Sequence, residues 1–180
     1  MGSTMEATTT QNQTLASFAK RYGRLDLDAF LAQFDCPFLV EAAHAAGLRD
    51  ESGPQAYRTE YIASADASSK LLGAEDRELW PIRKRADSAF SGHIGVGRTP
   101  NLDICIARTG VSKFHAYFSE REGVFQLTDK ESTNGTFVGG ERINPGTPIS
   151  LRDGVKLEFA NHPFTFMSPA RFHRLMQSVG

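Results

Sequence analysis

The feature that most constrains the fold is a series of short apolar segments that begins at residue 79. In most of them apolar and polar residues alternate for a few positions, and glycine, asparagine or aspartate soon follows. A period of two is typical of β-strands, and many short strands with turns at close spacing favour a β-sandwich. The predicted strands are residues 79–84, 93–96, 103–106, 114–118, 125–128, 136–138, 141–143, 155–159 and 164–166. We therefore expect residues 76–168 to be mainly β.

Proline and glycine positions add detail to the predicted sandwich. Pro81 cannot donate a hydrogen bond to a neighbouring strand, so its strand is expected at a sheet edge. Gly139 and Gly140 separate two of the segments and supply the positive φ angles of a two-residue turn, which predicts a hairpin. After the last strand, three large apolar residues recur at helical spacing, which predicts a C-terminal helix over residues 169–180.

The first 75 residues differ in composition from the rest of the chain. Residues 1–13 contain no aromatic residue and are rich in threonine and glutamine, so we expect a disordered tail. Residues 14–75 are rich in alanine and show helical spacing in parts, so we expect a mainly helical N-terminal region. Its apolar stripes are typical of packing surface, and its role is not evident from the sequence. The boundary with the sandwich is expected between Ser69 and Leu79.

Two short helices are predicted in this N-terminal region. One follows Thr14, after which apolar residues recur at positions i, i+3, i+4 and i+7. The second begins at Asp26 or Asp28, because either aspartate can cap a helix N-terminus. Residues 38–40 fit either a strand or the start of a further helix, and residues 57–61 fit an added strand.

The net charge of −1 limits the ligands that the chain can bind. Residues 1–75 carry 6 Lys and Arg against 10 Asp and Glu, a balance of −4, and residues 76–180 carry 14 against 11, a balance of +3. Neither half has the broad basic face that an extended polyanion such as duplex DNA requires, so no nucleic-acid partner is expected. A single phosphate held by a few donors remains compatible with this balance.

The chain shows the features of a cytoplasmic protein. No run of 18 apolar residues predicts a membrane span, and the polar N-terminus lacks the apolar core of a secretory signal. Cys36 and Cys105 are far apart and belong to no CxxC motif, which suits packed thiols in a reducing compartment.

The sequence supports no catalytic, cofactor or metal site. Residues 95–97 begin a dinucleotide fingerprint, but Pro100 replaces its third glycine. Ser112 and His115 suggest a hydrolase, but residues 110–114 lack the second glycine of a nucleophile elbow. The histidines and cysteines have no metal-ligand spacing. We therefore expect a protein that is not an enzyme and carries no cofactor or metal.

Polar residues at the predicted strand ends instead suit one phosphate group. Arg98 ends a strand, and its guanidinium can bond two phosphate oxygens at once. Ser112 precedes another strand and can donate its hydroxyl hydrogen. A third loop carries Thr133 and Asn134 ahead of Gly135, which permits a tight turn that leaves these two side chains facing outward.

These motifs resemble the forkhead-associated (FHA) domain, a family whose members read phosphothreonine peptides, and the chain looks like a small bacterial-type member. The G-R, S-x-x-H and N-G elements occur in the family's order and spacing within residues 94–166. Leu102 stands where the family often has asparagine, and Ala160 stands where it often has glycine. The matching segments are IGVGRT at 94–99, VSKFHAYF at 111–118, LTDKESTNGTFVGG at 127–140 and ISLRDGVKLEF at 149–159.

The resemblance implies an FHA-type β-sandwich of about eleven strands that holds its peptide in loops at one end. Arg98 and Ser112 would contact the phosphate, with help from Thr133. Lys113 and Asn134 would hold the peptide backbone or the phosphate. A small pocket for the γ-methyl group would favour phosphothreonine over phosphoserine.

The resemblance also implies that Gly97, His115 and Gly135 shape the loops without touching the ligand. Taken singly, these motif residues have ordinary structural explanations: Arg98 as a surface ion-pair arginine, for example, or Ser112 as a turn residue. Only their occurrence together favours the phosphate site.

Two functions follow as hypotheses. The first is a phosphothreonine-dependent adaptor in Ser/Thr-kinase signalling, whose partners are a threonine-phosphorylated protein or peptide and, as a further candidate, a Ser/Thr protein kinase. The second is a phosphate-independent scaffold that assembles a complex through the sandwich faces and the N-terminal region. A threonine cluster at residues 8–10 adds the hypothesis that a phosphorylated tail docks in cis, where a flexible tether raises its effective concentration.

Overall fold

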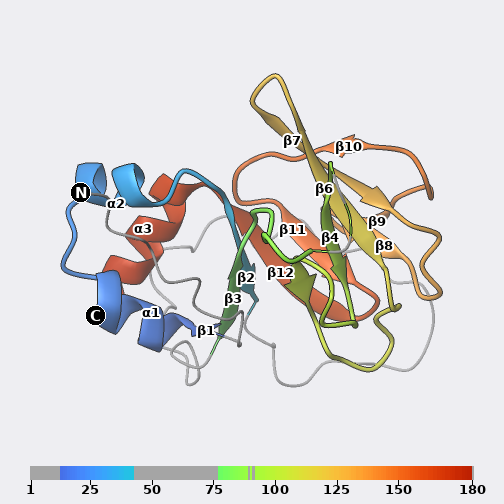
Figure 1. Ribbon diagram of the computed structural model, residues 1–180, viewed down its shortest axis with the longest axis horizontal. Coiled ribbons are helices and arrows are strands. Elements are labelled where there is room, and N and C mark those ends of the chain that lie inside the picture. Colours follow the sequence, from blue (N-terminus) through green and yellow to red (C-terminus); the bar gives the residue numbers. More distant parts are fainter. Residues whose placement is uncertain (1–12, 43–76, 89, 91, 180) are drawn as a thin grey trace.

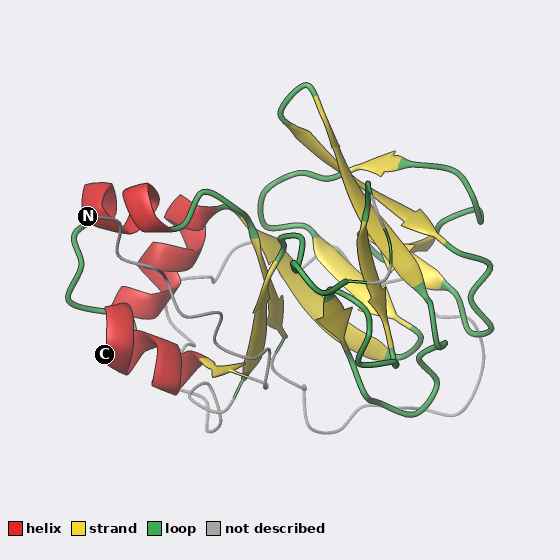
Figure 2. Ribbon diagram, viewed as in Figure 1, coloured by secondary structure: helices red, strands yellow, loops and turns green. Residues whose placement is uncertain are grey.

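The computed structural model describes residues 13–42, 77–88, 90 and 92–179. Within these ranges twelve strands form two sheets, and three helices lie together at one side of the sheets (Figures 1 and 2). The predicted mainly β sandwich with N-terminal helices and a C-terminal helix is confirmed. The predicted strand at 57–61, the tail over residues 1–12 with its threonine cluster, and most of the boundary region between 69 and 79 lie outside the described residues.

The smaller sheet has five strands, four of which come from residues 94–129. Only the β4–β5 pair is parallel, and all other neighbours are antiparallel. Four of these strands were predicted within a few residues, whereas the two-residue strand β10 was not. In sheet order they are β10 (Ile149–Ser150), β7 (Val124–Asp129), β6 (Ala116–Arg121), β4 (Ile94–Gly97) and β5 (Ile104–Cys105).

The larger sheet has seven strands, all antiparallel to their neighbours. The predicted hairpin joins β8 to β9 and is confirmed, with φ angles of 62° at Gly139 and 89° at Gly140. In sheet order the strands are β1 (Gln13–Thr14), β3 (Glu78–Pro81), β2 (Phe38–Glu41), β12 (His162–Met167), β11 (Lys156–Phe159), β8 (Thr136–Val138) and β9 (Glu141–Arg142).

Strand β2 settles the segment that the sequence left open between strand and helix. It lies between β3 and β12, where Leu39 pairs with Trp80 on one side and with Phe166 on the other. Phe38 and Val40 belong to one apolar core and Leu39 to the other, so both faces of the strand are buried and no alternation shows in the sequence. The sandwich thus includes a strand that precedes the predicted boundary between residues 75 and 76, and that boundary itself stays a prediction.

Pro81 lies in strand β3, at a position where the sheet can accommodate a proline. This strand was expected at an edge, and it lies one place in from the edge because the two-residue strand β1 pairs with Glu78 and Leu79. Pro81 pairs with Phe38 of β2 and lies beyond the end of β1. On that side, no described strand requires the hydrogen-bond donor that proline lacks.

The helices begin at the residues that cap them. Thr14 and Ser17 form a capping box at the start of α1 (Leu15–Tyr22). Of the two candidate aspartates, Asp26 caps α2 (Leu27–Gln33), with its Oδ1 2.8 Å from the backbone nitrogen of Ala29. Ser168 caps α3 (Pro169–Gln177).

The helices cover part of the larger sheet and create a second apolar core (Figure 2). Phe172 of α3 stacks on Phe38 of β2, with their ring centroids 4.1 Å apart. The second core consists of Leu15, Phe18, Phe30, Phe34, Phe38, Val40, Leu79, Phe172 and Met176. The first core lies between the two sheets and includes Val96, Ala116, Phe118, Leu127 and Phe159. The N-terminal helices are therefore an integral layer of the folded unit.

Candidate functional site

Three loops that carry predicted site residues meet at Ser112. Arg98 follows β4, and its backbone nitrogen lies 2.9 Å from the carbonyl oxygen of Ser112, which precedes β6. Thr133 lies between β7 and β8, and its backbone N–H donates to Oγ of Ser112 at 3.1 Å. The Ser112 Oγ also lies 3.5 Å from Oγ1 of Thr133, at the limit of a hydrogen bond. The spacing of the motifs in the sequence thus corresponds to a junction of three loops in space.

His115 lies in the interior and joins the Ser112 loop to the loop that contains Gly135. Its side chain is fully buried, with Nδ1 3.1 Å from the backbone nitrogen of Ser112 and Nε2 3.1 Å from the carbonyl oxygen of Gly135. Burial lowers the pKa of His115, although the Gly135 carbonyl and the Asp129 carboxylate act in the opposite direction. A neutral ring with its proton on Nε2 satisfies both contacts. His115 therefore ties the Ser112 loop to the Gly135 loop without reaching the surface.

Asp129 holds the loop that contains Thr133 and Asn134. It is buried and accepts hydrogen bonds from the N–H and the hydroxyl of Ser132 and from the hydroxyl of Thr136. Burial raises the pKa of Asp129, but these hydrogen bonds together outweigh burial and hold it below the ordinary value. The sequence analysis missed this bracing role, although an aspartate three residues before a serine is a local signal for a side-chain-capped turn.

Two predicted loop-shaping glycines lie where a side chain would collide. A Cβ atom at Gly97 would lie 2.4 Å from the carbonyl oxygen of Lys113. Gly135 has a φ angle of +87°, and a Cβ atom there would lie 2.5 Å from Nε of Arg142. These positions allow neighbouring loops and side chains to approach closely.

The side chains around Ser112 point polar groups to the surface. Arg98, Lys113, Thr133 and Asn134 are exposed, and Ser112 is half-buried. Within the described residues, the side chains of Arg98 and Lys113 form no hydrogen bond or ion pair. Asn134 donates from Nδ2 to the carbonyl oxygen of Gly110 at 2.8 Å, so part of its amide already holds a neighbouring turn. The junction therefore presents two cations, two hydroxyl groups and an amide to an external ligand.

Leu102 and Ala160, the two residues that depart from the family pattern, lie in different environments. Leu102 is fully buried in the apolar interior. Ala160 has a φ angle of 61°, in the left-handed region that favours glycine. Its backbone nitrogen lies 3.0 Å from the carbonyl oxygen of Gly135, so it is adjacent to the loop that contains Thr133 and Asn134.

No group of three or more histidine, cysteine, aspartate or glutamate side chains within the described ranges could hold a metal ion. Likewise, no helix in the described part of the chain is long and apolar enough to cross a membrane.

Residues 94–160 match the family model of the FHA domain, which confirms the resemblance in the sequence over this part of the chain. The chain is 32% identical over 78 residues to the transcriptional regulatory protein EmbR of Mycobacterium tuberculosis, which covers 43% of this chain and 20% of EmbR. It is 33% identical over 72 residues to the oxoglutarate dehydrogenase inhibitor of Corynebacterium efficiens, covering 40% of this chain and 49% of the inhibitor. The match thus spans about a fifth of EmbR and about half of the inhibitor.

Solved structures of FHA domains are also similar to this chain. The structure of M. tuberculosis EmbR in complex with a low-affinity phosphopeptide has 25% sequence identity and a TM-score of 0.43, covering 53% of this chain and 22% of that chain. The FHA domain of the CT664 protein from Chlamydia trachomatis has 18% identity and a TM-score of 0.45, covering 73% of this chain and 97% of that domain.

Proposed function

We propose that this FHA domain binds threonine-phosphorylated protein segments and acts as an adaptor in Ser/Thr-kinase signalling. One observation carries the proposal: three loops join at Ser112 and leave the cationic side chains of Arg98 and Lys113 unpaired beside it within the described structure. A partly exposed cluster of donors around one small hydroxyl suits a single phosphate group.

Each site residue has a distinct proposed role. The Arg98 guanidinium bonds two phosphate oxygens, and Lys113 adds a second positive charge. The Ser112 oxygen already accepts the Thr133 N–H, so its hydroxyl hydrogen can turn to the phosphate, and the Thr133 hydroxyl assists. Asn134 uses one amide hydrogen for Gly110, which leaves its second amide hydrogen and its Oδ1 for the peptide backbone.

The expected affinity follows from the charges involved. Phosphothreonine carries about −1.5 to −2 charges, and a hydrogen bond to a charged group contributes about 1.5–3 kcal/mol. About three or four such bonds contribute about 4.5–12 kcal/mol in total. After the free energy of ordering a flexible peptide is subtracted, we expect at most about −8 kcal/mol, which is a micromolar Kd.

The proposed partner is a threonine-phosphorylated protein, and a Ser/Thr kinase is a second candidate because it makes the recognised group. The EmbR structure with a phosphopeptide supports this class of ligand. The free thiols Cys36 and Cys105 support a cytoplasmic setting.

The test is a titration of a phosphothreonine peptide library against the wild type, Arg98→Ala and the control Arg152→Ala. Arg152 is also exposed, and its side chain forms no hydrogen bond or ion pair in the described part of the chain. We expect Arg98→Ala to weaken binding by about 100-fold, the loss of about two charge-assisted hydrogen bonds, with an unchanged free energy of unfolding. Equal binding by all three proteins, or no preference over unphosphorylated peptide, would refute the proposal and favour the phosphate-independent scaffold.

A further inference from the structure

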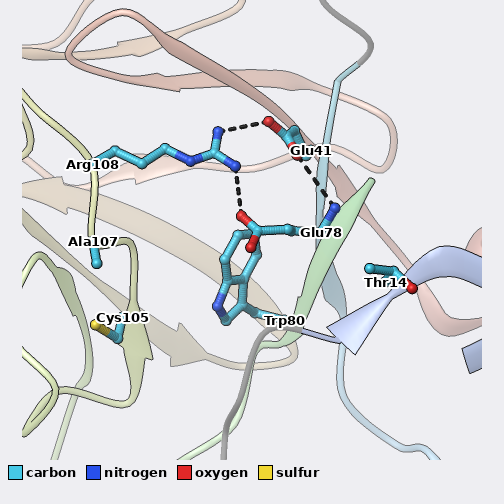
Figure 3. Close-up of a pocket in the computed structure, with 7 residues that line it drawn as sticks. All are labelled: Thr14, Glu41, Glu78, Trp80, Cys105, Ala107 and Arg108. Atoms are coloured by element: carbon cyan, nitrogen blue, oxygen red, sulfur yellow. Dashed lines mark hydrogen bonds and ion pairs between the residues drawn. The ribbon is translucent and has the colours of Figure 1, made fainter. Parts of the chain in front are cut away.

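Arg108 lies outside the predicted site and is held between two carboxylates (Figure 3). Its Nη1 is 2.6 Å from Oε1 of Glu41, and its Nη2 is 2.5 Å from Oε2 of Glu78. The side chains of Arg108, Glu41 and Glu78 are 23%, 17% and 21% exposed, so all three are largely withdrawn from water. We call this group the Arg108 clamp.

The clamp joins the ends of two interior strands of the larger sheet to the segment that follows an edge strand of the smaller sheet. Glu41 ends β2 and Glu78 begins β3, both in the larger sheet, whereas Arg108 follows β5 of the smaller sheet. The three residues line a hollow of about 480 Å³ at this seam, together with Thr14, Trp80, Cys105 and Ala107 (Figure 3). The Arg108 guanidinium also lies 5.9 Å from the ring centroid of Phe164, within the range of a cation–π contact.

A four-residue turn leads from the clamp to the phosphopeptide site. The backbone nitrogen of Val111 lies 3.2 Å from the carbonyl oxygen of Arg108, which closes the turn, and Ser112 is the next residue. The turn is held from two other elements: Nε2 of His162 lies 2.9 Å from the Thr109 carbonyl oxygen, and Nδ2 of Asn134 donates to the Gly110 carbonyl. Movement of the turn would therefore displace Ser112 and Asn134 together.

We propose that Arg108 is a positioning residue for phosphopeptide binding. Held by Glu41 and Glu78, it fixes the turn over residues 108–111 and thereby keeps Ser112 and Asn134 in their binding geometry. Strands β2 and β3 thus contribute to ligand affinity without touching the ligand. This inference rests on the proposed function.

The clamp and long-range electrostatics predict opposite changes in phosphopeptide affinity when Glu41 and Glu78 are neutralised. Replacing Glu41 and Glu78 by glutamine removes two negative charges from the molecule. If only long-range electrostatics mattered, this change would raise the affinity for a phosphate or leave it unchanged. The clamp predicts the opposite, because an unheld Arg108 releases the turn. A direct contact between Arg108 and the ligand also predicts no loss from the glutamine substitutions.

The experiment uses the full chain and a phosphothreonine peptide that the wild type binds. The variants are Arg108→Ala, Arg108→Lys and the pair Glu41→Gln with Glu78→Gln. The matched control is the pair Glu120→Gln with Glu122→Gln, which removes the same charge. These residues lie at the far end of β6 from Ser112. We expect a Kd about 3- to 30-fold weaker for Arg108→Ala and for the Glu41 and Glu78 pair. Arg108→Lys should lie between these and the wild type, because an ammonium group lacks the two-sided guanidinium fork.

A second measurement separates positioning from loss of stability. Amide hydrogen exchange without peptide should accelerate at Val111 and Thr133 in the clamp variants and stay slow in β6 and β7. Combining the glutamine pair with Arg108→Ala should weaken binding no further than Arg108→Ala alone, because the clamp acts as a unit.

Affinity that is unchanged or stronger in the glutamine pair, or exchange at Val111 that stays at the wild-type rate, would overturn the clamp while leaving the proposed function intact. A uniform acceleration of exchange over the whole chain would also overturn it. Failure of the wild type to bind any phosphothreonine peptide would refute the proposed function, and with it the clamp's role in binding.

Discussion

At the scale of single residues, Gly97 leaves no space for a side chain between β4 and the loop before β6. A Cβ atom there would lie 2.4 Å from the Lys113 carbonyl oxygen and 2.8 Å from Cδ1 of Leu102. Backbone cannot move aside as a flexible side chain can. We expect Gly97→Ala to reduce the free energy of unfolding by about 1–3 kcal/mol and to weaken phosphopeptide binding, because Arg98 follows directly. Urea unfolding and peptide titration measure the two effects, and wild-type values in both would contradict this account.

Ala160 offers the reverse case, because its backbone conformation suits glycine. With a φ angle of 61°, the Ala160 methyl group strains the backbone. We expect Ala160→Gly to raise the free energy of unfolding by about 0.5–1 kcal/mol. Relief of the backbone strain stabilises the folded state, and the greater freedom of glycine in the unfolded chain offsets part of this gain. The same change at Ala32, which is exposed in α2, should lower it by about 1 kcal/mol. A loss of stability at both positions would show that Ala160 is unstrained.

The residues facing outward at the site were more predictable than those that brace it. Arg98, Ser112 and Thr133 lie in short motifs with glycines nearby, and such motifs are visible in a single sequence. The bracing contacts of His115 with Gly135, and of Arg108 with Glu41 and Glu78, join residues far apart in the chain. No local pattern specifies such a pair, because its geometry exists only after both sheets have formed.

At the scale of elements, predictability depended on how many faces of an element are buried. Strands with one face in the core alternate, and helix α1 shows its buried Leu15 and Phe18 at helical spacing. Strand β2 is buried on both faces and reads as a plain apolar run, which fits a strand or a helix equally. In α2 Phe30 is buried, and so is Phe34, which caps its C-terminus, whereas Leu27 and Leu31 are exposed, so apolar residues at helical spacing do not by themselves identify the buried face.

The helical layer gives a prediction at this scale. Phe172 of α3 is fully buried and stacks on Phe38 of β2. We expect Phe172→Ala to lower the free energy of unfolding by about 3–5 kcal/mol, through lost apolar burial and a residual cavity. The exposed Arg174 on the same helix provides the control, since Arg174→Ala should change stability by no more than about 0.5 kcal/mol. Thermal or urea unfolding measures both, and a small effect at Phe172 would mean that α3 is not an integral layer.

At the scale of the whole molecule, three buried groups whose pKa values are lowered contribute to the acid response: His115, Asp103 and Asp129. The pKa of His115 is lowered from 6.5, chiefly by burial. The pKa values of Asp103 and Asp129 are below 3.8, because hydrogen bonds outweigh the raising effect of burial. All three groups bind fewer protons when folded than when unfolded, so stability falls as the pH drops. The loss from His115 begins below 6.5, and that from the aspartates begins below 3.8.

Urea unfolding at a series of pH values measures this dependence. The unfolding free energy should be level between pH 7 and pH 8 and fall in two stages on acidification. At alkaline pH it should fall again, because burial raises the pKa of Cys36 from 9.0 to about 11. In His115→Gln the first stage should disappear while the second remains. A profile that is flat between pH 7 and pH 5 in the wild type would contradict a buried neutral His115.

The arrangement of the strands also leads to a prediction about a fragment that lacks the N-terminal region. A chain that begins at residue 76 lacks β1 and β2, so β3 loses both of its neighbours, β12 loses one, and six of the nine residues of the second apolar core are missing. We expect this fragment to aggregate or stay unfolded, because it exposes unpaired strand edges and a large apolar surface. Circular dichroism and size-exclusion chromatography test this outcome against the full chain. A soluble, cooperatively folding fragment would show that the N-terminal layer is dispensable.

The pairing of β2 with β12 places Phe38 opposite Met167, so during translation β2 emerges from the ribosome long before β12. Protein synthesis proceeds at about 5–20 residues per second, so β2 waits on the order of ten seconds for its partner. Strand β3 is made much earlier and can pair with one edge of β2, but the other edge stays unpaired for the whole interval beside two apolar faces. Sheets that close through such distant pairings fold slowly and are open to intermolecular contacts meanwhile. The yield of folded protein in the cell should therefore depend on chaperones that shield β2 until β12 has been made.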